Sequence, residues 1–200
     1  MNIRISCIVE GHGDVKAVPI LIRRVIHTIA PALSVDIPTP IRVPKTRLVR
    51  PGELERAVEL AARRAMPGGG VFILLDSDDE CPAQAGPELM ARARAVRQDI
   101  PLALVLAKRE FEAWFLAAAE SLRRERGLAQ DLIGPERPED IRGAKEWLSR
   151  HMSADRHYVE TLDQPALTAR FDLQQARRAD SFDKCYREIE GLARRLLAGL

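Results

Sequence analysis

Hydrophobic residues recur with two different periods at the start of the chain. Residues 3–9 (IRISCIV) begin as an alternating pattern and become continuously apolar, which is typical of a strand that is buried on both faces. Residues 14–29 place apolar side chains at every third or fourth position, which predicts an amphipathic helix that Asp14 can cap. The two predicted elements are separated by a turn, Glu10-Gly11-His12-Gly13.

The same kind of pattern continues along the chain. Five prolines between residues 31 and 51 predict a loop, with one short edge strand near Ile41–Val43. The elements expected after it are a helix over 52–65, a strand over 71–75, a helix over 87–97 and a strand over 102–107. Strands that alternate with helices indicate an α/β fold with a mainly parallel sheet covered by helices on both faces.

The remaining part of the chain lacks strand patterns. Helices are expected over 144–151 and 181–200, and a polar stretch with no strong period lies between them. We therefore expect an α/β domain over residues 1–120 and a helical carboxyl-terminal extension over 121–200 that packs on it.

Acidic residues follow three of the predicted strands. Glu10 follows the first, Asp76 and Asp78 follow the strand over 71–75, and Glu110 and Glu112 follow the strand over 102–107. A single acid at a strand end is usually a turn or cap residue, but the carboxyl ends of parallel strands meet at one edge, where open α/β sheets bind ligands. Side chains two residues apart in an extended chain point the same way, so each pair can act together. Clustered carboxylates repel each other unless a cation neutralises them, and oxygen ligands favour Mg²⁺ or Mn²⁺.

The glycines of the first turn suggest a different contact. Gly11 and Gly13 allow a tight turn that brings the backbone and the following helix close to a phosphate. Lys16 lies one turn into that helix, where it either faces the same anion or is solvated. Because Lys16 also takes the place of the third glycine of a G-x-G-x-x-G motif, a dinucleotide-binding oxidoreductase is not expected.

Charge and composition narrow the choice of function. The 200 residues are 46% apolar and carry 31 Lys and Arg against 29 Asp and Glu, so the net charge of +2 offers no large basic field for nucleic acid. The stretch 42–50 nevertheless contains four cations and no anion. The apolar runs are too short for a membrane span, and three scattered cysteines argue against disulfides and zinc. With no signal-peptide pattern at the amino terminus, a cytoplasmic location is expected.

Several of these residues resemble a known family. Glu10-Gly11-x-x-Asp14 before a helix, and Asp76-x-Asp78 after an apolar strand, resemble the TOPRIM domain. Residues 110–116 (EFEAWFL), together with Lys145, Asp172-Leu173 and residues 181–183, resemble the bacterial domain-of-unknown-function family 4276, related to the TOPRIM domain of overcoming-lysogenization-defect nucleases. This similarity extends over nearly the whole chain.

The resemblance implies a Rossmann-like TOPRIM fold with a metal site. Glu10 would act as a general acid or base or as a metal ligand, and Asp76 and Asp78 would bind Mg²⁺. Glu110 or Glu112 would complete a second metal position.

These observations lead to one main hypothesis and two alternatives. The main hypothesis is a Mg²⁺- or Mn²⁺-dependent phosphodiesterase that acts on nucleic acid in phage defence or repair, in which Lys108 joins Glu10 and Glu110 in catalysis and Arg109 holds phosphate. The metal ligands would be Glu10, Asp76, Asp78 and Glu112. The alternatives are a non-catalytic module that binds nucleic acid or a protein partner, and an enzyme that acts on a small phosphate ester.

Overall fold

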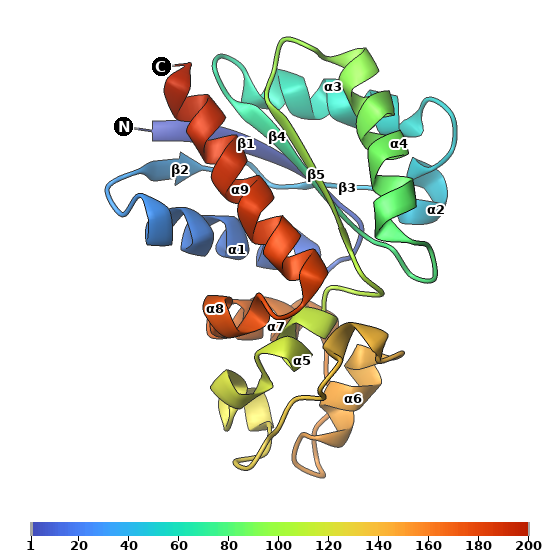
Figure 1. Cartoon of the computed structure of the whole chain (residues 1–200), viewed down its shortest axis with the longest axis vertical. Helices are drawn as coiled ribbons and strands as arrows, with labels where there is room; N and C mark the ends of the chain where they lie inside the picture. Colours follow the sequence, from blue (N-terminus) through green and yellow to red (C-terminus); the bar gives the residue numbers. More distant parts are fainter. Residues whose placement is uncertain (1, 200) are drawn as a thin grey trace.

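A parallel β-sheet forms the centre of the molecule (Figure 1). The computed structural model describes residues 2–199. The strands run in the order β2 (Ser34–Asp36), β1 (Asn2–Val9), β4 (Gly70–Asp76) and β5 (Leu102–Ala107). A fifth short strand, β3 (Ile41–Arg42), pairs with the last residues of β1. All pairings are parallel, so β1, β4 and β5 end at the same edge.

Helices cover both faces of this sheet. Helices α1 (Asp14–Ile29) and α9 (Asp180–Ala198) lie against one face, and α3 (Glu53–Ala65) and α4 (Pro82–Val96) lie against the other (Figure 1). In β4, Phe72 joins the apolar cluster on the α1 and α9 side, whereas Ile73 joins the cluster on the α3 and α4 side. Burial on both faces explains why the central strands are continuously apolar.

Short helices follow the carboxyl ends of the strands (Figure 1). They are α5 (Ala113–Ala117), α6 (Ala144–Arg150), α7 (Glu160–Thr168) and α8 (Leu173–Ala176), with single 3-10 turns at Ala119–Leu122, Glu125–Gly127 and Pro138–Asp140; a further short helix, α2 (Lys45–Leu48), precedes α3. Trp114 of α5 packs edge-on against Phe182 of α9, and its indole Nε1 donates a hydrogen bond of 2.8 Å to Ser181 Oγ. These contacts tie the short helices to the long final helix.

The predicted α/β class and the parallel sheet are confirmed. The expected division at residue 120 falls inside the turn Ala119–Leu122, whose apolar side chains belong to the same buried cluster as β1 and α9. Among residues 2–199, no helix is long and apolar enough to cross a membrane.

The structure differs from the predicted elements in several places. Helix α4 begins at Pro82 rather than at 87, because proline is well tolerated in the first turn of a helix. Strand β2 lies within the proline-rich loop, and α7 lies within the polar stretch that showed no period. Asp14 does not cap α1 from the preceding position, because it is the first helical residue and Gly13 is the N-cap.

Candidate functional site

A polar hollow of about 390 Å³ lies at the edge where β1, β4 and β5 end. We call it the acidic hollow; its lining residues are Glu10, Asp76, Asp78, Asp79, Arg109, Glu110, Arg142, Gly143 and Lys145. Four of the five acids predicted to meet at this edge therefore line one surface, and the fifth, Glu112, is buried.

Glu10 and Asp76 are brought together by the strand pairing. Val9 is paired with Leu74, so the residues that follow β1 lie beside the end of β4. The backbone N–H of Asp76 donates to Glu10 Oε2 at 3.3 Å, and the N–H of Phe111 donates to Asp76 Oδ1 at 2.9 Å.

These two carboxyls repel each other when both are ionised. Burial raises the pKa of Asp76 well above its ordinary range, and the nearby carboxylates of Asp14, Glu112 and Glu10 raise it further. The pKa of Glu10 is raised mainly by burial, with a further contribution from the charge of Asp78. A cation in the acidic hollow would relieve this repulsion.

Asp78 is arranged differently from the prediction for an extended chain. Its φ of 51° turns the backbone away from the strand direction, and its carboxylate is exposed. Lys45, which is itself buried, pairs with Asp78 at 3.0 Å and with Glu80 at 3.3 Å, and donates to the carbonyl oxygen of Ser77 at 2.9 Å. Lys45 is therefore fixed by acids of its own chain rather than held in an open basic loop.

Glu110 and Glu112 occupy different depths. Glu110 is half-buried and accepts a hydrogen bond of 2.6 Å from the N–H of Ala144, the first residue of α6. Glu112 is 1% exposed and accepts a hydrogen bond of 2.8 Å from the hydroxyl of Tyr158. Burial raises the pKa of Glu112 to about 8. Glu110 thus reaches the acidic hollow, whereas Glu112 lies beneath its surface.

Lys145 supplies a positive charge among these acids. Its Nζ lies 3.0 Å from Glu160 Oε2 and 3.9 Å from Glu112 Oε1. Burial alone would lower the pKa of Lys145, but the charges of Glu112 and Glu160 outweigh it and raise the pKa. Lys145 is therefore protonated at neutral pH and partly neutralises the site.

The glycine turn already binds carboxylates of the chain. The N–H of Gly11 donates to Asp14 Oδ2, and the N–H of Gly13 donates to Glu160 Oε1, both at 2.8 Å. A Cβ on Gly13 would lie 1.9 Å from Gln164 Oε1, so glycine is required here by the packing of α7. A phosphate at this turn would have to displace these carboxylates. The side chain of Lys16 is exposed.

The two cations that follow β5, Lys108 with its predicted role in catalysis and Arg109 with its predicted role in phosphate binding, lie in different hollows. Arg109 lines the acidic hollow and pairs with Asp79 at its rim. Lys108 instead pairs with Asp140 at 3.2 Å and lines a neighbouring hollow of about 160 Å³. The structure thus brings Arg109, but not Lys108, to the acids.

Several residues of the site carried no signal that local sequence patterns reveal. Arg142 and Glu160 come from the segment after residue 120, more than 60 residues from the strand ends they approach. Lys145 is marked in the sequence only by the family resemblance. Their placement depends on how the short helices fold back, which the hydrophobic pattern does not encode.

Glu10 and Asp76 offer carboxylate oxygens, the kind of ligand that magnesium prefers. Within residues 2–199, no three His, Cys, Asp or Glu side chains lie where they could jointly hold an ion. Mg²⁺ characteristically uses one or two carboxylates and completes its shell with water and substrate phosphate. Glu10 and Asp76 provide such a pair, and because burial is the main cause of the raised pKa of each, a bound cation would stabilise their charged forms.

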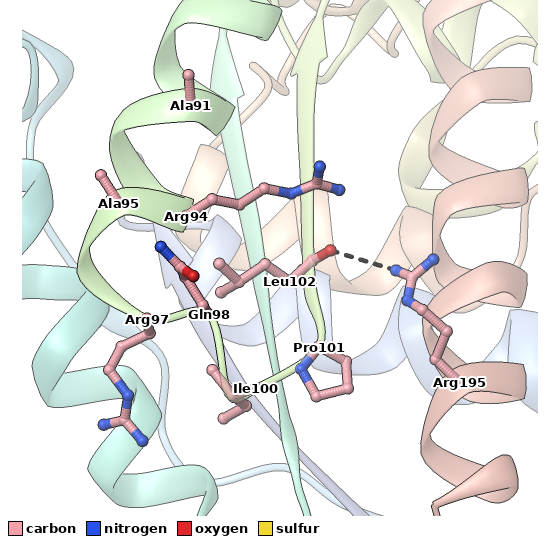
Figure 2. A pocket seen from close by; sticks show the side chains of 9 residues that line it. All are labelled: Ala91, Arg94, Ala95, Arg97, Gln98, Ile100, Pro101, Leu102 and Arg195. Atoms are coloured by element: carbon pink, nitrogen blue, oxygen red, sulfur yellow. Dashed lines mark hydrogen bonds between the residues drawn. The ribbon is translucent and has the colours of Figure 1, made fainter.

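A larger hollow of about 560 Å³ lies at the opposite end of β5 (Figure 2). Arg94 from α4 and Arg195 from α9 approach it from opposite sides, and Arg195 donates to the carbonyl oxygen of Leu102 at 3.2 Å. No acid is among its lining residues. The chemistry that the sequence predicts therefore belongs to the smaller, acidic hollow.

Comparison with known proteins identifies the family. The family described as Domain of unknown function (DUF4276) matches residues 9–190. The chain belongs to this family. The DUF4276 match includes the ends of all three central strands, α7 and most of α9, and so contains every residue of the acidic hollow. No curated protein and no solved structure matched the chain.

Proposed function

We propose that this DUF4276 protein is a Mg²⁺-dependent phosphodiesterase of the TOPRIM type that cleaves nucleic acid. The observation that carries the proposal is the adjacent pair Glu10 and Asp76 at the carboxyl edge of a parallel sheet, with Lys145 and Arg109 lining the same hollow. Acids and cations that face one surface suit a phosphodiester, which needs both a metal and positive charge around its oxygens.

Glu10 and Asp76 would hold the metal. Asp78 would join them only if it left its ion pair with Lys45. When bound, Mg²⁺ supplies Lewis acidity toward a phosphate oxygen and neutralises negative charge. Glu112 is not placed to bind directly, because it is buried and hydrogen-bonded to Tyr158.

The other residues of the hollow have separate tasks in this proposal. Arg109 offers a planar set of N–H donors to phosphate oxygens, and Lys145 adds a fixed positive charge. Burial raises the pKa of Glu110 toward neutral pH. A carboxylate with such a raised pKa is a stronger base and is suited to accept a proton from water. Lys108 has no part in this arrangement, because it faces the neighbouring hollow.

The test is cleavage of labelled DNA, RNA and a generic chromogenic phosphodiester with Mg²⁺ or Mn²⁺. We expect the native protein to cleave nucleic acid, and Asp76→Asn to lose roughly a hundredfold or more of the rate, because the neutral amide binds a hard cation poorly. The amide oxygen of Asn still accepts a hydrogen bond from Phe111, so the fold is retained. Asp131→Asn removes an equal charge at an exposed position and should cleave normally.

Two results would overturn the catalytic proposal. One is the absence of cleavage with either metal, and the other is an unchanged rate in Asp76→Asn. Cleavage of the small diester alone would indicate a small phosphate ester as substrate.

A non-catalytic module that binds nucleic acid is the second candidate. It is favoured by the ion pair between Asp78 and Lys45, which occupies one of the predicted metal ligands. Calorimetric titration with Mn²⁺ separates the two candidates. A catalytic site should bind the ion and lose binding in Asp76→Asn, whereas a pure binding module should show no Asp76-dependent heat.

A further inference from the structure

Arg109 is held in an unusual and costly conformation. Its φ is 68°, in the left-handed region that non-glycine residues rarely adopt. The backbone is fixed on both sides, because its N–H donates to Ser77 Oγ at 3.1 Å and its carbonyl oxygen accepts from the N–H of Asp78 at 3.0 Å. Its side-chain Nε is buried and has no hydrogen-bond partner in the described chain. Strained backbone conformations cluster at active sites and ligand clamps, and a buried donor without a partner requires an explanation, for which a ligand is one candidate.

The guanidinium groups of Arg109 and Arg142 meet at a single carboxylate. Both pair with Oδ1 of Asp79, Arg142 at 2.8 Å. All three residues line the acidic hollow, and Asp79 lies in the turn that follows β4 rather than in a helix or strand. Within this group of three side chains, two positive charges face one negative charge.

We propose that Arg109 and Arg142 form a phosphate subsite of the acidic hollow, and that Asp79 fills this subsite until a nucleic-acid phosphate displaces its carboxylate. The proposal rests on the proposed function, in that it assigns the phosphate to nucleic acid. It adds two residues, Asp79 and Arg142, that neither the sequence motifs nor the family match assigns.

Breaking the ion pair between Asp79 and Arg142 would cost little. The side chains of Asp79 and Arg142 are 69% and 70% exposed, and ion pairs of that kind contribute little to stability. A phosphodiester offers two charged oxygens to the planar donor sets of the arginines, whereas Asp79 offers both arginines the same oxygen. A phosphate therefore gains contacts that the carboxylate does not make.

Asp79→Asn tests the proposal, because it removes the competing charge and keeps the shape of the side chain. Binding of a short fluorescent single-stranded oligodeoxynucleotide is measured by anisotropy in EDTA at low salt, so that neither metal nor cleavage contributes. We expect the Kd of Asp79→Asn to fall roughly threefold to tenfold below that of the native protein. Asp131→Asn, which changes the net charge equally, should bind like the native protein.

A second pair of variants shows whether the gain passes through the arginines. Arg142→Gln should weaken binding, and Asp79→Asn in the Arg142→Gln background should recover much less affinity than it gives alone. The subsite is refuted if Asp79→Asn binds no tighter than Asp131→Asn, or if no variant binds the oligonucleotide.

The outcome is separable from that of the proposed function. Tighter binding by Asp79→Asn in a protein that never cleaves with Mg²⁺ would retain the subsite and reject the phosphodiesterase. Normal cleavage with unchanged binding in Asp79→Asn would do the reverse.

Discussion

The pKa and the accessibility of each carboxyl at this edge depend on its burial as much as on the charges near it. Glu10 and Asp76 were predictable as a pair, because each follows a predicted strand and parallel strands end together. Asp78 was not predictable, because its left-handed φ accompanies contacts with Lys45 and Arg109, which come from distant segments. Glu112 follows the same spacing rule as Glu110, yet Tyr158 covers it, and its pKa rises to about 8.

The raised pKa of Glu112 makes stability depend on pH in a defined direction. The folded protein keeps a proton on Glu112 up to a pH of about 8, whereas the unfolded chain releases it near the ordinary value of 4.5. The folded state therefore binds more protons in this window, and the free energy of unfolding falls as the pH rises through it. The native protein should lose stability as the pH rises, and we expect this loss to be smaller by roughly 1–3 kcal/mol in Glu112→Gln, because the amide does not ionise. The amide oxygen still accepts the hydrogen bond from Tyr158.

Urea unfolding at several pH values across that window measures the effect. The curve of stability against pH should be flatter for Glu112→Gln than for the native protein, while Asp131→Asn keeps the native slope. Parallel curves for Glu112→Gln and the native protein would show that Glu112 is ionised throughout.

At the scale of elements, helix α7 supplies the groups that contact the glycine turn. Glu160 accepts a hydrogen bond from the N–H of Gly13, and Gln164 donates one to Asp14 Oδ1 at 2.8 Å. Polar groups therefore hold α7 against the start of α1. This explains why the hydrophobic pattern predicted the strands and not α7. The strands are apolar on both faces, whereas α7 buries Asp163 and Gln164. A period of apolar residues cannot reveal a helix whose buried side is polar.

Gly13→Ala is expected to destabilise the protein by roughly 2–4 kcal/mol, because the new methyl group would overlap Gln164 and Glu160. Gly86→Ala is the matched control. Gly86 lies within α4, where an added Cβ would meet its nearest neighbour, Lys184 Nζ, at 3.7 Å, so alanine should be neutral or stabilising by up to about 1 kcal/mol.

Thermal and urea unfolding of the two alanine variants give the comparison. If Gly13→Ala were as stable as the native protein, α7 would have to pack less closely on the turn, and the N–H of Gly13 would be open to a ligand.

At the scale of the whole molecule, charge is balanced locally as well as in total. The net charge is +2, and many arginines pair with acids of the same chain, such as Arg92 with Glu55 and Arg97 with Asp99. Near the acidic hollow, Lys145 and Lys108 are also paired. Under the proposed function, a nucleic acid would therefore meet a few cations that are paired with acids of the chain, rather than a broad basic surface.

That distribution predicts a weak dependence of oligonucleotide affinity on salt. Each phosphate neutralised on a single strand contributes about −0.7 to the slope of log K against log salt, so two or three contacts give a slope between roughly −1 and −2.5. Arg142→Gln should reduce the magnitude of the slope by about 0.7, because it removes one contact. Arg4→Gln, on β1 and paired with Asp36, should leave it unchanged. Anisotropy titrations between about 25 and 200 mM NaCl measure these slopes.

A slope steeper than about −4 would require a broad cationic surface outside the acidic hollow, and would place nucleic-acid binding on another face of the protein.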